Sequence, residues 1–132
     1  LHDVGKPLVL KLLDQCEKNL LEPLTPGATE ELIEALHVEL GHMILLSWRI
    51  PESICDVTLR HHEAKPGSGD ILLARVQAGD AIAQYLASPE QSRMEFPLIE
   101  HPAIERLNFT ELELADLLIG IEDQLQLLLQ YA

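Results

Sequence analysis

Apolar residues recur at helical spacing along most of the chain, and no alternating apolar–polar run is long enough to predict a strand. The clearest stripe lies between about Glu30 and Trp48 and consists of Ile33, His37, Leu40, Gly41, Ile44 and Trp48. Leucine is abundant and aromatic residues make up only 4%, which favours helices over strands. We therefore expect an all-α fold, a compact bundle of five or six helices.

Helix boundaries follow from prolines, glycines and capping residues. Residues 1–22 predict the end of one helix, a turn supplied by Gly5, and a helix of about ten residues with Pro7 at its first position. Further helices are expected over about 30–48, 51–62, 70–87 and 111–130. Thr29 is the expected N-cap of the helix over about 30–48, and Thr110 with Glu113 fits a capping box for the helix over 111–130. Residues 88–108 are expected to be irregular.

The length and the net charge of the chain limit the classes of protein to which it can belong. A chain of 132 residues supports a single domain, expected here over 1–132. Because the chain starts at Leu1 directly in a motif, we expect that domain to be truncated on its N-terminal side. A net charge of −13 argues against a nucleic-acid partner. We expect neither a membrane span nor a secretory leader.

Two isolated cysteines, Cys16 and Cys55, suit a reducing cytosol. They can in principle pair, but we interpret them as two buried free thiols. The expected location is therefore cytoplasmic.

Asp80 places a carboxylate on an apolar helix face, among Leu73, Val76, Ala83 and Ala87. An ionised carboxylate there is costly unless it is paired or coordinates a metal. One interpretation is a buried carboxylate satisfied by an Arg, a His or backbone amides. Because several histidines accompany Asp80 in the sequence, we favour metal coordination by this carboxylate.

Histidines pose the same question at several positions. His37 lies in the middle of the 30–48 stripe and should point inward. His42 lies about 140° around the same helix and is expected to be a surface residue without a structural role. His61 and His62 are adjacent, so on an ideal helix they point about 100° apart. Both address one centre only near a helix end or if the centre holds more than one ion. The alternative is one inward and one solvated histidine.

His2 and Asp3 are also adjacent, so it is equally open whether both address one centre. His101 has no partner nearby in sequence and is not a candidate ligand. Individually the signals are weak, but together they bring imidazoles and two carboxylates from four segments of a helical chain. This donor set suits Fe, Mn, Zn, Ni or Co better than calcium, with one or two ions in the site. A cysteine-rich structural zinc site is not indicated.

The chain resembles the HD superfamily and more closely its HDOD branch, the HD-related output domains. The resemblance rests on the string LHDVGK at 1–6, on His37 and Gly41 followed by the Trp48-x-x-Pro51 turn, on the double histidine at 61–62 and on the aspartate of AGDAIA. It covers nearly the whole chain. It implies an HD-domain-like helical bundle of the kind found in bacterial signalling proteins.

The resemblance also implies roles for particular residues. His2 and Asp3 match the superfamily's defining metal-binding pair, and Asp80 matches its final ligating aspartate. The remaining histidines, His37, His61 and His62, match those that complete a second metal position in the HD-GYP phosphodiesterases. Lys6 matches a lysine that contacts a phosphate in catalytic relatives.

Two departures from the superfamily pattern bear on function. The first ligating histidine of the superfamily lies on a helix upstream of the HD pair, where this chain has not yet begun. The Gly-Tyr-Pro turn after the double histidine is replaced by HHEAKPGSGD, which argues against a cyclic-di-GMP phosphodiesterase of the HD-GYP group.

Three functions remain open. The first is a signalling or regulatory output module that carries a divalent-metal site. The second is a metal-dependent phosphohydrolase or phosphodiesterase acting on a nucleotide or cyclic nucleotide. In that enzyme Asp3 would anchor the metal that activates water, and Lys6 would stabilise charge on the phosphoryl oxygens.

The third is a metal-free helical interaction module. The end of the last helix has more apolar residues than one face needs, namely Leu125, Leu127, Leu128, Leu129 and Tyr131. We expect this end to pack on a protein partner or on an absent domain. A phosphorylated small molecule is the other expected ligand.

Overall fold

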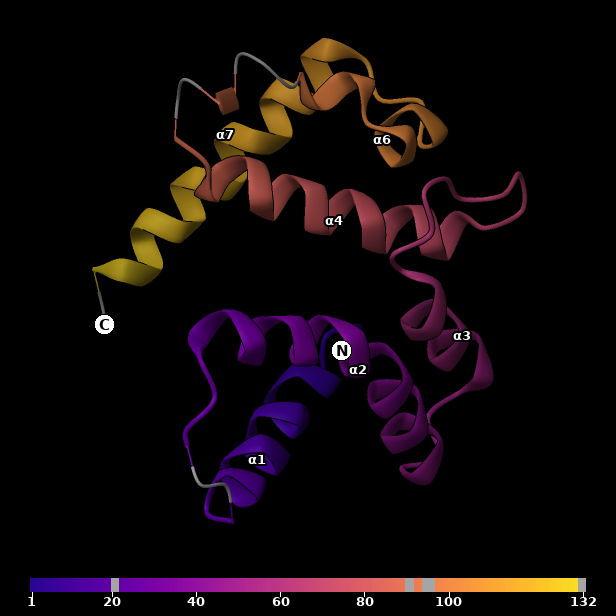
Figure 1. The fold of residues 1–132 in the computed structure, drawn as a ribbon. Coiled ribbons are helices and arrows are strands. Elements are labelled where there is room, and N and C mark those ends of the chain that lie inside the picture. The colour runs from indigo at the N-terminus through magenta and orange to yellow at the C-terminus, as the bar shows by residue number, and fades with distance from the viewer. Residues whose placement is uncertain (20–21, 90–91, 94–96, 131–132) are drawn as a thin grey trace. The chain divides into compact units, whose positions relative to one another are not determined.

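A computed structural model describes residues 1–19, 22–89, 92–93 and 97–130 of the chain. The described residues form six α-helices and one 3-10 helix, and they contain no strand, so the all-α prediction is confirmed (Figure 1). The chain divides into two compact units, Leu1–Glu63 and Ala64–Ala132. The prediction of one domain over 1–132 stays a prediction.

The described residues of the first unit form three helices, α1 (Gly5–Glu17), α2 (Pro26–Ser47) and α3 (Glu52–Arg60). Helix α1 packs against α2, and α2 packs against α3 (Figure 1). The side chains that are almost wholly buried in this unit are Val9, His37, Leu45, Cys55 and Thr58. A histidine therefore lies among the fully buried side chains of the unit.

Helix α2 begins four residues before the expected start. Thr25 is extended, with φ −71° and ψ 152°, and its hydroxyl accepts a hydrogen bond from the Ala28 amide at 3.2 Å. Pro26 occupies the first helical position, where its missing N–H costs nothing. Thr29 was expected to be the N-cap, but its hydroxyl donates to the Thr25 carbonyl inside the first turn. That prediction was wrong because Pro26 initiates the helix rather than ending the connector.

The expected turn at Gly5 is also corrected. Residues 2–4 form a turn, and Gly5 is the first residue of α1, buried and without positive φ. A Cβ on Gly5 would overlap the His37 carbonyl oxygen and lie 2.9 Å from the Gly41 amide nitrogen. Gly5 is therefore required for the close approach of α1 to α2. Pro7 is the third helical residue rather than the first.

The turn between α2 and α3 carries the Trp-x-x-Pro sequence. Arg49 adopts the left-handed conformation, with φ 57°, and the Ile50 amide donates to the Leu45 carbonyl at 3.1 Å. This is a Schellman-type helix ending in which an arginine takes the position usually held by glycine. Trp48, expected on the inward stripe, is 54% exposed, because at the C-cap the chain has already left the helical path.

His42 was expected to be a surface residue without a structural role, and this prediction was wrong. Its side chain is half-buried, and Nδ1 lies 3.0 Å from the Cys55 carbonyl oxygen on α3. Because a carbonyl only accepts, Nδ1 carries the proton and donates it. His42 thus joins α2 to α3.

The second unit contains α4 (Ile71–Ala87), the 3-10 helix η1 (Leu98–Glu100), α6 (Pro102–Arg106) and α7 (Glu111–Leu129). Its buried core consists of Ala78, Ile82, Leu98, Ala103, Ile104 and Leu114. The Thr110–Glu113 capping box of α7 is confirmed, with each side chain bonding the other residue's amide.

The segment expected to be irregular, 88–108, contains η1 and α6. The His101 side chain accepts a hydrogen bond from the Ala103 amide at 3.3 Å, and Pro102 takes the first helical position. The same proline that signalled a break therefore begins a short helix. Residues 90–91 and 94–96 of this segment lie outside the described residues.

The two cysteines were both expected to be buried free thiols. Cys16 and Cys55 are both free, but Cys16 is exposed, so only Cys55 fits the prediction of a buried thiol.

Near the end of α7, Leu127, Leu128 and Leu129 are exposed, and packing on a partner stays a prediction. Tyr131 lies outside the described residues. No helix among the described residues is long and apolar enough to cross a membrane.

Candidate metal centre

The centre begins with the turn that precedes α1. The Val4 amide donates to the Leu1 carbonyl and the Lys6 amide to the Asp3 carbonyl, both at 3.0 Å. This turn carries His2 and Asp3 to the N-terminal end of α1, where the helix dipole favours a carboxylate. His2 Nε2 lies 3.3 Å from Asp3 Oδ2, and Lys6 Nζ lies 3.3 Å from Asp3 Oδ1.

His37 is held inside the first unit with a defined ring orientation. Its side chain is fully buried, and Nδ1 lies 2.9 Å from the Ile33 carbonyl oxygen and 3.1 Å from that of Glu34. Carbonyl oxygens only accept, so Nδ1 is the protonated nitrogen. In the neutral ring the lone pair is therefore on Nε2.

His61 is oriented in the same way by the end of α3. It is the C-cap residue, and its Nδ1 lies 2.7 Å from the Thr58 carbonyl oxygen, to which it donates. The lone pair of the neutral ring is again on Nε2. Backbone carbonyls fix the tautomers of metal-ligating histidines in this way.

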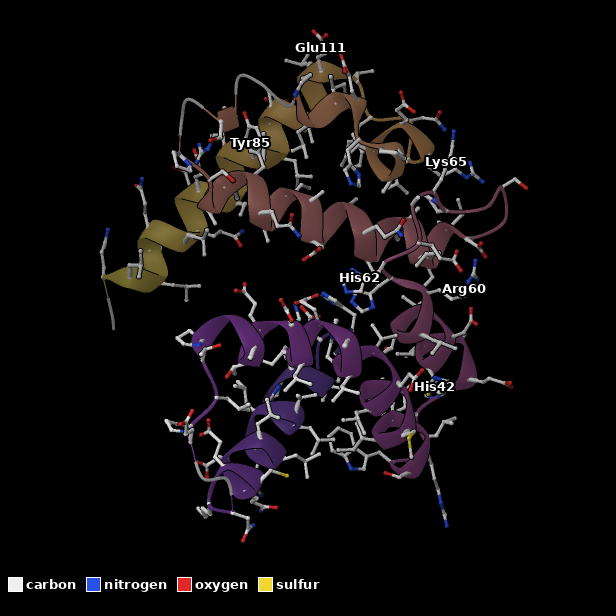
Figure 2. The ribbon with its side chains drawn as sticks, in the orientation of Figure 1. His42, Arg60, His62, Lys65, Tyr85 and Glu111 are labelled. Atoms are coloured by element: carbon white, nitrogen blue, oxygen red, sulfur yellow. The ribbon has the colours of Figure 1, made fainter. Side chains whose placement is uncertain are left out.

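His62 follows directly, is exposed, and lies beyond the last residue of α3 (Figure 2). Its Nε2 is 2.9 Å from His37 Nε2, and its ring centroid is 4.0 Å from that of His61. Neighbouring histidines on an ideal helix would diverge. Here the helix ends at Arg60, which is one of the two conditions under which both rings address one centre.

The three histidines converge, each offering one ring nitrogen, and these atoms lie within 4.8 Å of one another. The same point is approached by Asp3 Oδ1, which is 3.7 Å from His37 Nε2 and 3.5 Å from His61 Nε2. Oδ1 is buried and accepts no hydrogen bond of good geometry from the residues that the structure describes. His2 borders this group, with its ring centroid 5.1 Å from that of His61.

These donors fit a divalent transition metal. Bonds of about 2.1 Å place ligand atoms about 3.0 Å apart in an octahedron and about 3.4 Å apart in a tetrahedron. The observed separations of 2.9, 3.5 and 3.7 Å lie close to those values. The Nε2 lone pairs of His37 and His61 both face the negatively charged Oδ1 of Asp3. These electron-rich atoms repel one another unless a cation lies between them, and this favours a metal ion.

Electrostatics keep these groups in their ligating forms. Burial lowers the pKa of His61, helped by the charges of His2 and His37 and opposed by the bond to Thr58 and the charge of Asp3. Burial and then the charges of His61 and His37 lower the pKa of His62, although Glu34 opposes them.

The pKa of Asp3 lies below its ordinary value of 3.8 although burial raises it. The close contact with the Lys6 ammonium, which lies 3.3 Å from Oδ1, lowers the pKa of Asp3 most, and the charges of His2 and His61 add to it, so that together they outweigh burial. Both histidines are thus neutral and Asp3 ionised near pH 7, which is what a cation requires.

The first unit therefore brings together six of the residues predicted from sequence, namely His2, Asp3, Lys6, His37, His61 and His62. Asp80 belongs to the second unit, on α4, where it is half-buried and its Oδ2 accepts a hydrogen bond from the side-chain Nε2 of Gln84 at 2.8 Å. Ala83 and Ala87, expected to bury it, are exposed. The role of Asp80 as a ligand stays a prediction.

Two residues that the sequence did not single out also shape the centre. Thr58 supplies the carbonyl that orients His61, and Glu34 supplies one of the carbonyls that orient His37. The Glu34 carboxylate also lies 3.7 Å from Lys6 Nζ. Each residue stands three positions before the histidine it orients, and that spacing is the signal in the sequence.

Comparison with known proteins agrees with this geometry. Residues 1–64 match the family model of the HDOD domain, the HD-related output domain. This segment, which contains the whole first unit, belongs to the HDOD family. No curated protein and no solved structure matches the chain.

Proposed function

We propose that this chain is an output module of bacterial signal transduction whose first unit binds a divalent metal ion. The HDOD match supports the output role. The site is the group formed by Asp3, His37, His61 and His62, with His2 and Lys6 at its border. The proposal places the protein in the cytoplasm, in keeping with the free thiols of Cys16 and Cys55.

One observation carries the metal proposal. The Nδ1 protons of His37 and His61 are both committed to backbone carbonyls, so two Nε2 lone pairs face the buried Oδ1 of Asp3. A core that needed only hydrogen bonds would place a donor opposite an acceptor. This arrangement collects acceptors, as metal sites do. Imidazole and carboxylate ligands favour Fe, Mn, Zn, Ni or Co.

A second function, metal-dependent phosphoester hydrolysis, is favoured by the position of Lys6. Its ammonium lies 3.3 Å from Asp3 Oδ1, so it borders the proposed metal position and can face an anionic phosphoryl group. A bound metal would supply Lewis acidity and a nucleophilic water. Asp3 would hold the cation, and Lys6 would stabilise negative charge on the substrate. The substrate class is a nucleotide or cyclic nucleotide.

A third reading, a metal-free interaction module, is favoured by the short His37–His62 contact. Their Nε2 atoms are 2.9 Å apart, so one ring can donate to the other without any metal. This contact satisfies one pair of nitrogens only, and it leaves the approach of His61 to Asp3 unexplained.

Metal analysis of the purified chain and its Asp3→Ala variant tests the proposal. We expect about one or two equivalents of a transition metal in the wild type and a large loss in the variant. A wild-type chain that takes up no Zn²⁺, Mn²⁺ or Fe²⁺ on titration would favour the interaction module.

A release assay with bis(p-nitrophenyl) phosphate and nucleotide substrates separates the other two functions. Metal-dependent turnover that disappears in Asp3→Ala would establish the hydrolase. Metal binding without turnover is the result expected for an output module.

A further inference from the structure

Lys6 lies between two carboxylates that come from different segments. Its Nζ is 3.3 Å from Asp3 Oδ1, in the turn before α1, and 3.7 Å from Glu34 Oε1, on α2. The three side chains are partly exposed, 36% for Lys6, 36% for Asp3 and 53% for Glu34. One ammonium group is thus shared by two anions at the border of the candidate metal centre.

The shared atom matters because Asp3 Oδ1 is also the oxygen that faces the histidines. It lies 3.5 Å from His61 Nε2 and 3.7 Å from His37 Nε2. A metal bound by these nitrogens would draw on the same carboxylate charge as Lys6. Lys6 therefore competes with the metal for Asp3, and the strength of its contact with Asp3 affects metal affinity.

Glu34 is well placed to weaken that competition. It lies one helical turn before His37, whose Nδ1 donates to the Glu34 carbonyl at 3.1 Å. The side chain of Glu34 reaches the Lys6 ammonium from α2, the helix that also carries His37. Because the Glu34 carboxylate also attracts the ammonium, Lys6 neutralises less of the negative charge of Asp3.

We propose that Glu34 is a positioning residue of the metal centre, which draws Lys6 partly off Asp3 and so raises the affinity of the site for a divalent cation. This inference rests on the proposed metal-binding function. It goes beyond that function by giving a role to a carboxylate that is not itself a ligand.

The alternative is that Glu34 and Lys6 form an ordinary surface ion pair of little consequence. A double-mutant cycle distinguishes the two, because coupling between residues 6 and 34 in metal affinity is measurable only if Glu34 acts through Lys6. The variants are Glu34→Gln, Lys6→Gln and the double variant. Glu39→Gln is the matched control, since it removes the same charge from the same helix at a residue two positions beyond His37.

Zn²⁺ affinity would be measured on the full chain by competition with a chromogenic chelator. We expect Glu34→Gln to weaken binding about threefold to tenfold and Lys6→Gln to strengthen it by a similar factor, as befits partly screened charges. In the Lys6→Gln background, Glu34→Gln should change the affinity less than about twofold, and Glu39→Gln should do no more in the wild type. An equal effect of Glu34→Gln in both backgrounds overturns the inference, as does an effect no larger than that of Glu39→Gln.

A second readout works without metal and separates failure of the inference from failure of the proposed function. Acetylation of lysines by acetic anhydride, which transfers an acetyl group to the neutral amine and releases acetate, is followed by mass spectrometry and compares Lys6 with Lys11, an exposed lysine on the same helix. Glu34→Gln should change the Lys6 rate at least about threefold and leave the Lys11 rate unchanged. If Zn²⁺ binds but Lys6 reactivity does not respond, the inference fails and the metal site stands. If Zn²⁺ does not bind to the wild type, the metal site fails, and with it the role of Glu34 in metal affinity.

Discussion

Gly5 lies directly against the backbone of His37. A side chain on Gly5 would overlap the His37 carbonyl oxygen, and a Cβ on Gly41 would in turn lie 3.3 Å from the Gly5 amide nitrogen. Asp3 stands two residues before Gly5, and its Oδ1 is 3.7 Å from His37 Nε2. The contact between the two glycine-bearing helices therefore sets the gap between a carboxylate and an imidazole of the candidate metal centre.

Gly5→Ala should force α1 away from α2. We expect a loss of about 1–3 kcal/mol in the free energy of unfolding, the usual cost of overpacking, measured by urea denaturation. Because Asp3 moves with α1, Zn²⁺ affinity should fall as well, by about tenfold or more.

Gly27→Ala is the matched control, in the first turn of α2. Nothing lies within 4 Å of a Cβ added there, so this change should be neutral or stabilising by up to about 1 kcal/mol. Equal stability of the two variants would show that Gly5 is not needed for packing.

His61→Ala should remove one of the proposed metal ligands and leave the fold intact. We expect Zn²⁺ affinity to fall by more than about 100-fold, measured by chelator competition, because ligand loss exceeds the effect of losing a supporting hydrogen bond. The control is His42→Ala on α2, which removes the bond to the Cys55 carbonyl. That variant should lose about 1 kcal/mol of stability and keep its metal affinity. If His42→Ala lost Zn²⁺ affinity and His61→Ala kept it, the assignment of His61 as a metal ligand would be wrong.

Stability of the metal-free protein should decrease on acidification through the histidine range. The pKa values of His61 and His62 lie below the ordinary 6.5 in the folded protein, chiefly because burial disfavours the charged ring. The unfolded chain then binds more protons than the folded one between the folded pKa and 6.5. Their contribution is fully present above 6.5 and is lost as the pH falls towards the folded pKa.

Urea unfolding in the presence of a chelator, between about pH 7.5 and 5.5, measures this dependence. The variant His61→Gln with His62→Gln should show a flatter profile, since glutamine does not titrate. A wild-type stability that rises on acidification would contradict the depressed pKa values.

The N-cap of α2 can be assigned by substitution. Thr25→Ala removes the hydroxyl that accepts from the Ala28 amide and should cost about 1 kcal/mol. Thr29→Ala removes only a hydroxyl that donates to the Thr25 carbonyl within the helix, so it should cost less than about 0.5 kcal/mol. Thermal unfolding followed by circular dichroism compares the two. A larger loss in Thr29→Ala would restore the original assignment from sequence.

Local signals explain what could be predicted. The Thr110–Glu113 capping box was recognisable because both partners lie within one turn and act through the backbone. The start of α2 was misassigned because Pro26 serves equally well to end a connector and to begin a helix. Gly5 was misassigned for a different reason, since its neighbour is His37, thirty-two residues away, and no local pattern reports such a contact.

The amino-acid sequence by itself determined the helical class, the family resemblance and the set of candidate imidazole and carboxylate ligands, because these depend on residue type and on spacing along the chain. Only the tertiary structure decided that His61 and His62 share a centre, since this depends on α3 ending at Arg60. It also decided which ring nitrogens face Asp3, because the carbonyls of Ile33 and Thr58 fix the tautomers of His37 and His61. Hydrogen-bond partners and distances of this kind arise from packing between helices, and packing has no one-dimensional signature.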